Sequence, residues 1–165
     1  MKLYDYQVDG AAWLTTGKRR YLADGMGLGK TVQACQAAQL LGARSVLVIA
    51  PASTLLNWES EWATWGNGAT FTTISYGSLR NLNRAKQWDL VIIDEAHFAK
   101  NPNAKRTKHS LEIAAEARNT ILLSGTPMPN DPTELFAPIQ ALWPEVLEDL
   151  GLETATDWLN RFCQY

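Results

Sequence analysis

The segment DGMGLGKT at residues 24–31 holds the residue types best suited to chemistry. Gly27 and Gly29 have no Cβ, so the backbone can adopt unusual dihedral angles there and approach an anion closely. Successive N–H groups of such a loop converge on a phosphate, and a helix that follows adds the positive end of its dipole. The Lys30 ammonium can reach the β- and γ-phosphates of a nucleotide, and the Thr31 hydroxyl can bind Mg²⁺. The segment therefore predicts a phosphate-binding loop.

The flanking residues support this interpretation. An apolar stretch at residues 21–23 precedes the loop, and a helical pattern at residues 31–41 follows it. Strand, glycine-rich loop and helix in that order are the context that a phosphate-binding loop requires. The strict pattern has glycine five residues before Gly29, whereas this chain has Asp24, so a glycine-rich turn before a helix remains the alternative.

A second candidate site is the segment DLVIIDEAH at residues 89–97, where Asp94 and Glu95 end an apolar strand. Unpaired buried carboxylates are costly, and a Mg²⁺–nucleotide would stabilise them. Asp94 can hold the metal through water, since Mg²⁺ loses its water reluctantly, and Glu95 can orient and deprotonate an attacking water. Taken alone, the segment also fits an acidic turn or a helix cap on a solvated edge.

A third segment, SGTP at residues 124–127, follows another apolar strand. The hydroxyls of Ser124 and Thr126 could sense a γ-phosphate or the carboxylates, and a simple Gly-Pro turn is the alternative. Strands of a parallel sheet bring the segments at their carboxyl ends to one edge, where ligands of such sheets bind. The three segments together therefore argue against coincidence.

Apolar runs alternate with helical patterns along the whole chain. The continuous run SVLVIA at residues 45–50 is typical of a strand buried on both faces of a parallel sheet. Other strands are predicted at residues 21–23, 71–75, 89–93 and 120–123. Helices are predicted at residues 3–14, 31–41, 54–65, 79–84, 108–117, 132–142 and 153–162. The alternation predicts an α/β fold with a doubly wound, mainly parallel sheet and helices on both faces.

Length and composition narrow the class of protein. At 165 residues the chain corresponds to a single domain, residues 1–165. The net charge of −2 does not indicate nucleic-acid binding, so any such binding requires a local patch. Cys35 and Cys163 suggest neither a disulfide framework nor a zinc site. No apolar run approaches the roughly 20 residues of a membrane span, so we expect a soluble, intracellular protein with no membrane partner.

Two surface features admit more than one interpretation. Leu55, Trp58, Trp62 and Trp65 share one helical face, and a buried core is favoured over base stacking for this stripe. A basic run without acidic residues could contact phosphates, or it could be a solvated loop. The run consists of Lys100, Lys105, Arg106 and Lys108, with His109 after it.

The motifs in their order resemble the first RecA-like lobe of a Swi/Snf-type ATPase of helicase superfamily two. LYDYQVDGAAWL resembles the Q motif of that family, LADGMGLGKT motif I, VLVIAPASTLLNWESEW motif Ia, DEAH motif II and SGTPMPNDPTELFAPI motif III. KNPNAKRTK after DEAH is typical of this family rather than of helicases in general. Asp24 is usual in motif I of the family, whereas Gly25 departs from the acidic residue common there.

The resemblance implies roles for individual residues. Gln7 would contact adenine, Lys30 and Thr31 would bind phosphate and Mg²⁺, and Asp94 and Glu95 would serve the metal and the water. The nucleotide contacts would comprise Gln7 and the loop residues Asp24, Gly25, Met26, Gly27, Leu28, Gly29, Lys30 and Thr31. His97 would couple the site to Ser124 and Thr126. Main-chain and hydroxyl groups around Pro51, Ser53 and Thr54 would follow a DNA backbone.

The family resemblance implies ATP-driven movement along duplex DNA, usually without strand separation. Such enzymes need a second RecA-like lobe, whose arginine fingers can raise the rate by about 10³–10⁵. Nothing after residue 144 resembles the motifs of that lobe, so this chain alone is expected to bind Mg·ATP weakly and hydrolyse it poorly. One alternative is a catalytically silent module that docks DNA or a protein. Another is a nucleotide switch, against which Gln7 and the DEAH continuation argue.

Overall fold

A parallel five-stranded sheet forms the centre of the computed structural model, which describes residues 2–83, 85–99, 104–126 and 132–162. The strand order is β1-β5-β4-β2-β3, and every pairing is parallel. The strands are β1 (Arg19–Leu22), β2 (Ser45–Ala50), β3 (Thr70–Ser75), β4 (Leu90–Ile93) and β5 (Asn119–Leu123). The predicted strands at residues 21–23, 71–75, 89–93 and 120–123 match these within two residues at either end.

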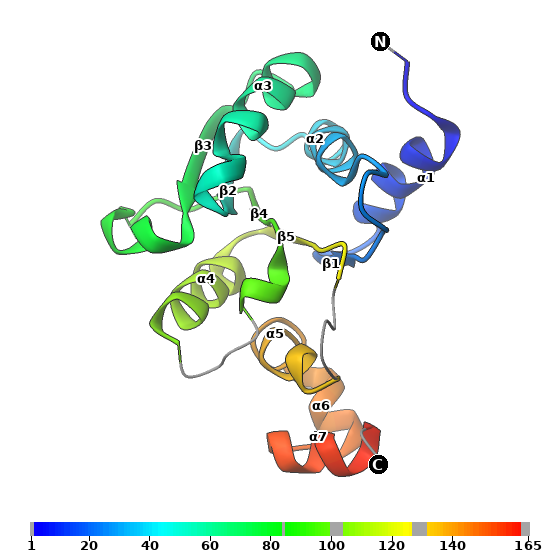
Figure 1. Ribbon diagram of the computed structural model, residues 1–165, viewed down its shortest axis with the longest axis vertical. Coiled ribbons are helices and arrows are strands. Elements are labelled where there is room, and N and C mark those ends of the chain that lie inside the picture. Colours follow the sequence, from blue (N-terminus) through cyan, green and yellow to red (C-terminus); the bar gives the residue numbers. More distant parts are fainter. Residues whose placement is uncertain (1, 84, 100–103, 127–131, 163–165) are drawn as a thin grey trace.

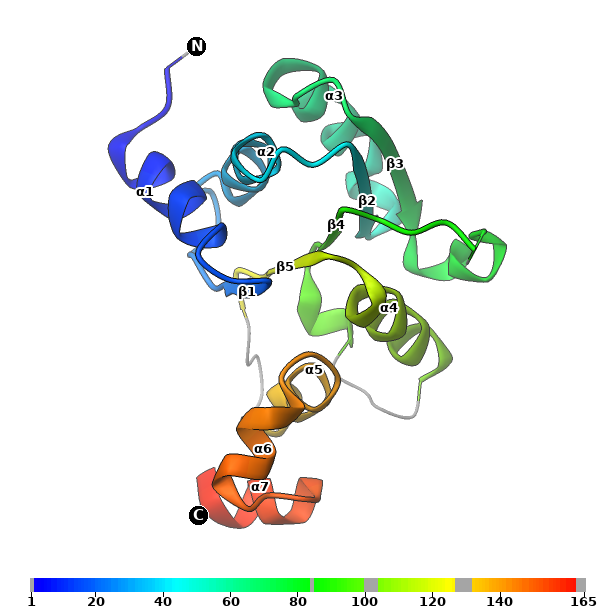
Figure 2. The ribbon, with the colours of Figure 1, turned by 180° about the vertical axis from the view of Figure 1, so that it is seen from behind.

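Helices cover both faces of this sheet, as Figures 1 and 2 show from opposite sides. One face carries α1 (Asp5–Leu14), α2 (Lys30–Leu40) and α3 (Leu55–Trp65). The other carries α4 (Lys105–Glu116) and α5 (Phe136–Leu142), with α6 (Pro144–Leu150) and α7 (Ala155–Phe162) packed beyond α5. The predicted doubly wound, three-layer α/β fold is therefore confirmed.

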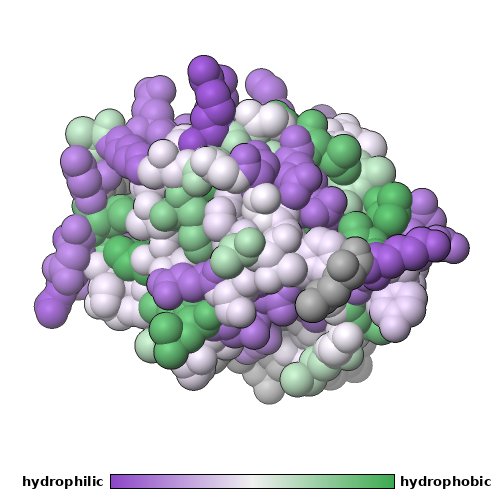
Figure 3. All heavy atoms as spheres, turned by 90° about the horizontal axis from the view of Figure 1, so that it is seen from above, coloured by the Kyte–Doolittle hydropathy of each residue, from purple (hydrophilic) through white to green (hydrophobic). Residues whose placement is uncertain are grey.

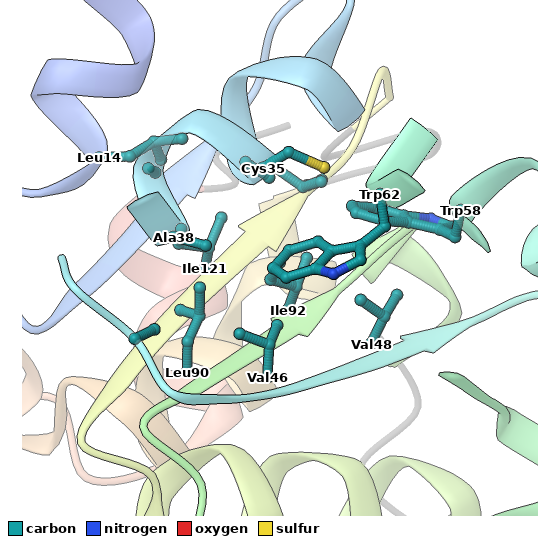
Figure 4. Packing of buried hydrophobic residues seen from close by; sticks show 14 of the residues in the cluster. Leu14, Cys35, Ala38, Val46, Val48, Trp58, Trp62, Leu90, Ile92 and Ile121 are labelled. Carbon is teal, nitrogen blue, oxygen red and sulfur yellow. The ribbon is translucent and has the colours of Figure 1, made fainter. Parts of the chain in front are cut away.

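The core lies on both sides of the sheet, which explains the uninterrupted apolar strands. Alternate residues of a strand point to opposite faces. Val46 and Val48 of β2 and Ile92 of β4 pack under α2 and α3, whereas Leu47 and Ile49 pack toward α4. Figure 4 shows the indole rings of Trp58 and Trp62 lying over the first of these surfaces. The tryptophan stripe is thus core at these two positions, as favoured from its spacing.

Cys35 lies in the same layer, fully buried in α2. Burial raises the pKa of its thiol to about 12, so the group stays protonated at neutral pH. It is a small packing residue of the core. Cys163 lies outside the described residues.

Three helix predictions need correction. In place of the α-helix predicted at residues 79–84, a 3₁₀ helix, η2 (Tyr76–Asn81), ends before Leu82, which is extended; Arg84 lies outside the described residues. The helix predicted at residues 108–117 begins earlier, at Lys105, so Lys105 and Arg106 lie on its first turn. The helix predicted at residues 132–142 starts as a 3₁₀ turn, η4 (Pro132–Leu135), before α5. Pro138 is tolerated there because it lies in the first turn of α5, where N–H groups have no helical partner.

Helix α6 was not predicted, although its ends carry recognisable signals. Pro144 occupies the first turn, and Gly151 after the last residue has φ 64°. Proline at the start and a left-handed glycine at the end are typical helix boundaries. The segment was missed because it is only seven residues long and follows α5 directly.

The surface is mixed in character. Figure 3 views the side on which α1, α2 and α3 lie, and hydrophobic side chains appear there scattered among hydrophilic ones. Within the part of the chain that the structure describes, no helix has the length and hydrophobicity to cross a membrane.

Candidate active site

Four strands deliver the candidate residues to one edge of the sheet. Strands β1, β5, β4 and β2 run side by side in the same direction, so the segments that follow Leu22, Leu123, Ile93 and Ala50 meet at their carboxyl ends. A cleft of about 320 Å³ opens at this edge. Its lining comprises Met26, Gly27, Gly29, Lys30, Thr31, Val32, Thr54, Asn57, Glu61, Asp94 and Glu95.

The predicted phosphate-binding loop, residues 24–31, takes its shape from two left-handed glycines. Gly27 has φ 80° and Gly29 has φ 74°, and Gly29 is the N-cap of α2. A Cβ added at Gly27 would meet nothing within 4 Å, whereas one added at Gly29 would collide with Nε2 of Gln7. Gly27 and Gly29 therefore both need glycine for the backbone angle, and at Gly29 an added Cβ would also displace the side-chain amide of Gln7.

The Lys30 side chain lies along its own loop. Its Nζ donates to the main-chain oxygens of Asp24 at 2.8 Å and of Gly25 at 3.0 Å. Both acceptors are neutral carbonyls, so the ammonium charge is not cancelled by a carboxylate contact. Gly25 has room for a side chain, since an added Cβ would lie 3.6 Å from Leu28 and no other heavy atom comes within 4 Å.

Two glutamines connect the loop to α1 and α2. Gln7 Nε2 and Gln33 Nε2 each donate to the Leu28 main-chain oxygen at 3.3 Å. Gln33 Nε2 also donates to Asp24 Oδ2 at 3.0 Å, and Tyr4 N donates to Gln7 Oε1 at 3.1 Å. Asp24 thus anchors the start of the loop to α2, which accounts for an aspartate where the general pattern has glycine.

Sequence reasoning missed Gln33, which is fully buried. The signal available in the sequence was a polar residue, Gln33, among the small and apolar residues of the helix predicted after the loop. Buried polar side chains are hydrogen-bonded in most proteins, so this position called for a partner.

Asp94 is held by neutral donors at the end of β4. Its Oδ2 accepts from the Trp58 indole N–H at 2.8 Å, and its Oδ1 accepts from the Glu95 N–H at 2.9 Å. The Tyr76 hydroxyl donates to the Asp94 main-chain oxygen at 2.7 Å. Burial raises the pKa of the Asp94 carboxyl, while the Trp58 bond acts in the opposite direction.

Glu95 adopts an unusual backbone conformation for a residue with a side chain. Its φ is 50°, in the left-handed region. Such a conformation is strained for residues other than glycine and is often found at functional sites. Glu95 lines the same cleft as Lys30 and Thr31.

His97 bridges the acidic turn and the segment after β5. Its Nδ1 lies 3.2 Å from Glu95 Oε2 and 3.2 Å from Ser124 Oγ. The Thr126 N–H donates to Ser124 Oγ at 3.1 Å. The structure therefore brings together the residues for which coupling was predicted, with Ser124 fully buried and Thr126 exposed.

The segment after β5 also approaches the phosphate loop. A Cβ added at Gly125 would lie 2.8 Å from Met26 Cγ and 3.4 Å from Lys30 Nζ. Glycine at this position allows the two segments to lie against each other.

Tyr21 of β1 lies beside Ser124 and Glu95. Burial raises the pKa of Tyr21 to about 12, and the Glu95 charge adds to the shift.

The candidate nucleic-acid residues divide into two groups. Ser53 is exposed beside half-buried Pro51 and Thr54, and Thr54 Oγ1 donates to the Pro51 main-chain oxygen at 3.0 Å. Lys105 and Arg106 are exposed on the first turn of α4. Lys100 lies outside the described residues.

The cleft suits a Mg²⁺–nucleotide by the chemistry of its lining. Thr31 and Asp94 face the same cleft, beside the glycine loop and the N-terminus of α2. Among the described residues no three His, Cys, Asp or Glu side chains form a metal-holding group. Mg²⁺ bound with a nucleotide needs only one or two carboxylates together with substrate phosphates. Thr31 and Asp94 are therefore the kind of oxygen ligands expected for Mg²⁺ bound with a nucleotide.

A comparison with solved structures defines the class of fold. The chain resembles the Sulfolobus solfataricus SWI2/SNF2 ATPase core in complex with dsDNA, with a TM-score of 0.82 and 26% identity. The match covers 98% of this chain and 39% of that one. Together with the parallel sheet, this similarity defines a RecA-like α/β domain.

The family follows from sequence. The family model of the SNF2-related domain matches residues 6–83 and 69–163, so the chain belongs to the SNF2-related domain family. The chain is 34% identical to protein CHROMATIN REMODELING 24 of Arabidopsis thaliana, over 89% of this chain and 18% of that protein. It is 31% identical to the transcription regulatory protein SNF2 of Saccharomyces cerevisiae, over 96% of this chain and 11% of that protein.

The chain thus spans less than a fifth of the length of these curated relatives. The alignment with the Arabidopsis protein runs over 194 positions, more than the 165 residues of this chain, so that relative contains residues with no counterpart here. The two matched segments overlap at residues 69–83, which include β3 and η2.

Proposed function

We propose that this chain is the ATP-binding lobe of a DNA-dependent ATPase that moves along duplex DNA. The observation that carries the proposal is the shared cleft. It joins Lys30 and Thr31 of the phosphate loop to Asp94 and Glu95 at the end of β4. Family membership supports the choice of ATP, since the matched family is that of a known ATPase core.

Each residue of the cleft has a proposed role. Lys30 and the loop N–H groups hold the phosphates, and Thr31 and Asp94 hold Mg²⁺. Bound Mg²⁺ would neutralise charge on the phosphates. Glu95 orients and deprotonates the attacking water, and His97 relays changes at Glu95 to Ser124 and Thr126. Gln7 contacts adenine from the N-terminal part of α1.

The proposed DNA contacts are the segment Pro51, Ser53 and Thr54 and the basic first turn of α4. Cations at the N-terminus of a helix are disfavoured by the helix dipole. The exposed Lys105 and Arg106 therefore gain from an external anion such as a DNA phosphate. The similar SWI2/SNF2 ATPase core is in complex with dsDNA, which supports the same class of partner.

A second RecA-like lobe, in the same polypeptide or in a separate one, would complete the enzyme. The relatives are far longer than this chain, which supports a larger parent. That lobe would supply arginine fingers to the transferring phosphoryl group.

A titration with a fluorescent ATP analogue, with Mg²⁺ and with EDTA, tests the nucleotide site. Lys30→Ala should weaken binding by about 10-fold or more, as expected for a charge-assisted hydrogen bond of about 1.5–3 kcal/mol. Lys18→Ala, at the opposite edge of the sheet just before β1, serves as the matched control and should leave the affinity unchanged. Equal affinities for the wild-type chain and Lys30→Ala would refute the assignment of the loop.

A salt titration tests the DNA contacts. Replacing Lys105 and Arg106 together by glutamine should weaken duplex binding and reduce the slope of log affinity against log salt by about 2. Lys18→Gln is the control with one exposed charge removed elsewhere. An unchanged slope would show that the first turn of α4 does not contact DNA.

A further inference from the structure

Trp58 makes a contact that its role in the core does not require. Its side chain is fully buried among the apolar residues under α3. Its indole nitrogen nevertheless reaches Asp94 Oδ2 at 2.8 Å, across 36 positions of sequence. Trp62, one turn further along α3, stacks on Phe71 at 4.3 Å between ring centroids, which is an apolar packing contact.

Tyr76 makes the complementary contact to the main chain. It is buried, and its hydroxyl donates to the Asp94 main-chain oxygen at 2.7 Å. This oxygen belongs to the peptide that joins Asp94 to Glu95, the residue with φ 50°. The hydrogen bond therefore holds the start of the strained turn.

The chemistry of these donors suits a carboxylate that must bind a cation. Trp58 and the Glu95 N–H fix the two oxygens of Asp94 in different directions, so rotation of the carboxylate is restrained. Both donors are neutral. They orient the carboxylate and leave its negative charge in place, whereas a lysine or arginine partner would cancel that charge. Each oxygen also keeps a free lone pair.

We propose that Trp58 and Tyr76 are positioning residues for the metal end of the nucleotide site, Trp58 through the carboxylate of Asp94 and Tyr76 through its main chain. The inference rests on the proposed function, since it assigns Asp94 to Mg²⁺. Partners that orient a ligating side chain typically contribute about 10–100-fold to metal affinity.

The test compares Trp58→Phe with the matched control Trp62→Phe. Affinity for a fluorescent ATP analogue is measured in Mg²⁺ and in EDTA. The Mg²⁺-dependent gain in affinity should fall about 10-fold or more in Trp58→Phe, while the affinity in EDTA stays unchanged. Trp62→Phe removes the same ring size from the same helix and should keep the full Mg²⁺ gain. Tyr76→Phe should lose part of it.

Nuclear magnetic resonance gives a readout that needs no nucleotide. The indole N–H signal absent from the spectrum of Trp58→Phe belongs to Trp58. This signal should move upfield in Asp94→Asn, where a neutral acceptor replaces the carboxylate. A signal that does not respond would overturn the proposal.

The outcomes separate the two hypotheses. If the wild-type chain gains no affinity from Mg²⁺, the proposed function fails and this inference fails with it. If the wild-type chain gains affinity and Trp58→Phe keeps the full gain, only the positioning role is overturned. An equal loss of affinity in Mg²⁺ and in EDTA would assign Trp58 to the core alone, with the same result.

Discussion

The phosphate loop and the acidic turn after β4 face the same cleft, but they are held in place differently. The loop is anchored by polar side chains: Lys30 and Gln33 bond to residues five to nine positions earlier, and Gln7 bonds to the Leu28 main-chain oxygen from α1. The turn is anchored by aromatic side chains, Trp58 and Tyr76, which lie 36 and 18 positions before Asp94.

The difference in anchoring predicts a difference in mobility. Met26 is 80% exposed and Leu28 42% exposed, so much of the loop can rearrange around a ligand. The donors of the turn are buried in the core and cannot move without disturbing it. The nucleotide should therefore rearrange the loop more than the turn.

The largest expected effect concerns the turn. With a second RecA-like lobe and duplex DNA supplied, Glu95→Gln should lower the rate of ATP hydrolysis by about 10²–10⁴-fold, since the amide cannot accept the proton of the attacking water. Nucleotide affinity should be unchanged. Phosphate release measures the rate, and Glu59→Gln, exposed on α3, is the acid-to-amide control. A rate close to that of the wild type would show that Glu95 is not the base.

The next effect concerns the loop. Gly29→Ala should lower the free energy of unfolding by about 1–2 kcal/mol, because alanine is strained at the φ of 74°. It should also weaken nucleotide binding, because the new Cβ displaces the side-chain amide of Gln7. Urea denaturation gives the stability. The control in the same loop, Gly25→Ala, has room for a Cβ and should change stability by less than about 0.5 kcal/mol. Equal effects at both positions would contradict the described loop.

The smallest effect concerns the stability of the turn. The raised pKa of Asp94 means that the folded chain binds its proton more tightly than the unfolded chain. This carboxyl contributes most to stability below its unfolded pKa of 3.8, and the contribution is lost as pH rises through the folded pKa. Asp94→Asn should therefore stabilise the chain at pH 7, and the gain should shrink toward pH 4. A gain in the free energy of unfolding that is constant with pH would argue against burial as the cause of the raised Asp94 pKa.

The same comparison explains what the sequence could predict. The strands β2 and β4 were predicted because strands buried on both faces are continuously apolar, and the loop because its glycines and lysine lie together. The contacts of Trp58 and Tyr76 depend on how α3 and η2 pack against the sheet, which no local pattern contains. The α-helix predicted from residue 79 proved to be the end of η2, because a short apolar pattern does not separate a 3₁₀ helix from an α-helix.

Gln7 and Gln33 donate to one shared acceptor, the main-chain oxygen of Leu28. A base that binds Gln7 would change the hydrogen bond from Gln7 to the Leu28 oxygen, and with it the anchoring of the loop. A phosphate that reshapes the loop would change the same hydrogen bond from the other side. With the proposed base contact of Gln7, the two ends of a nucleotide would thus be thermodynamically linked through a single carbonyl. By reciprocity, the factor by which the base alters phosphate affinity equals the factor by which phosphate alters base affinity. Discrimination among nucleobases by this lobe should accordingly depend on how many phosphates the ligand carries.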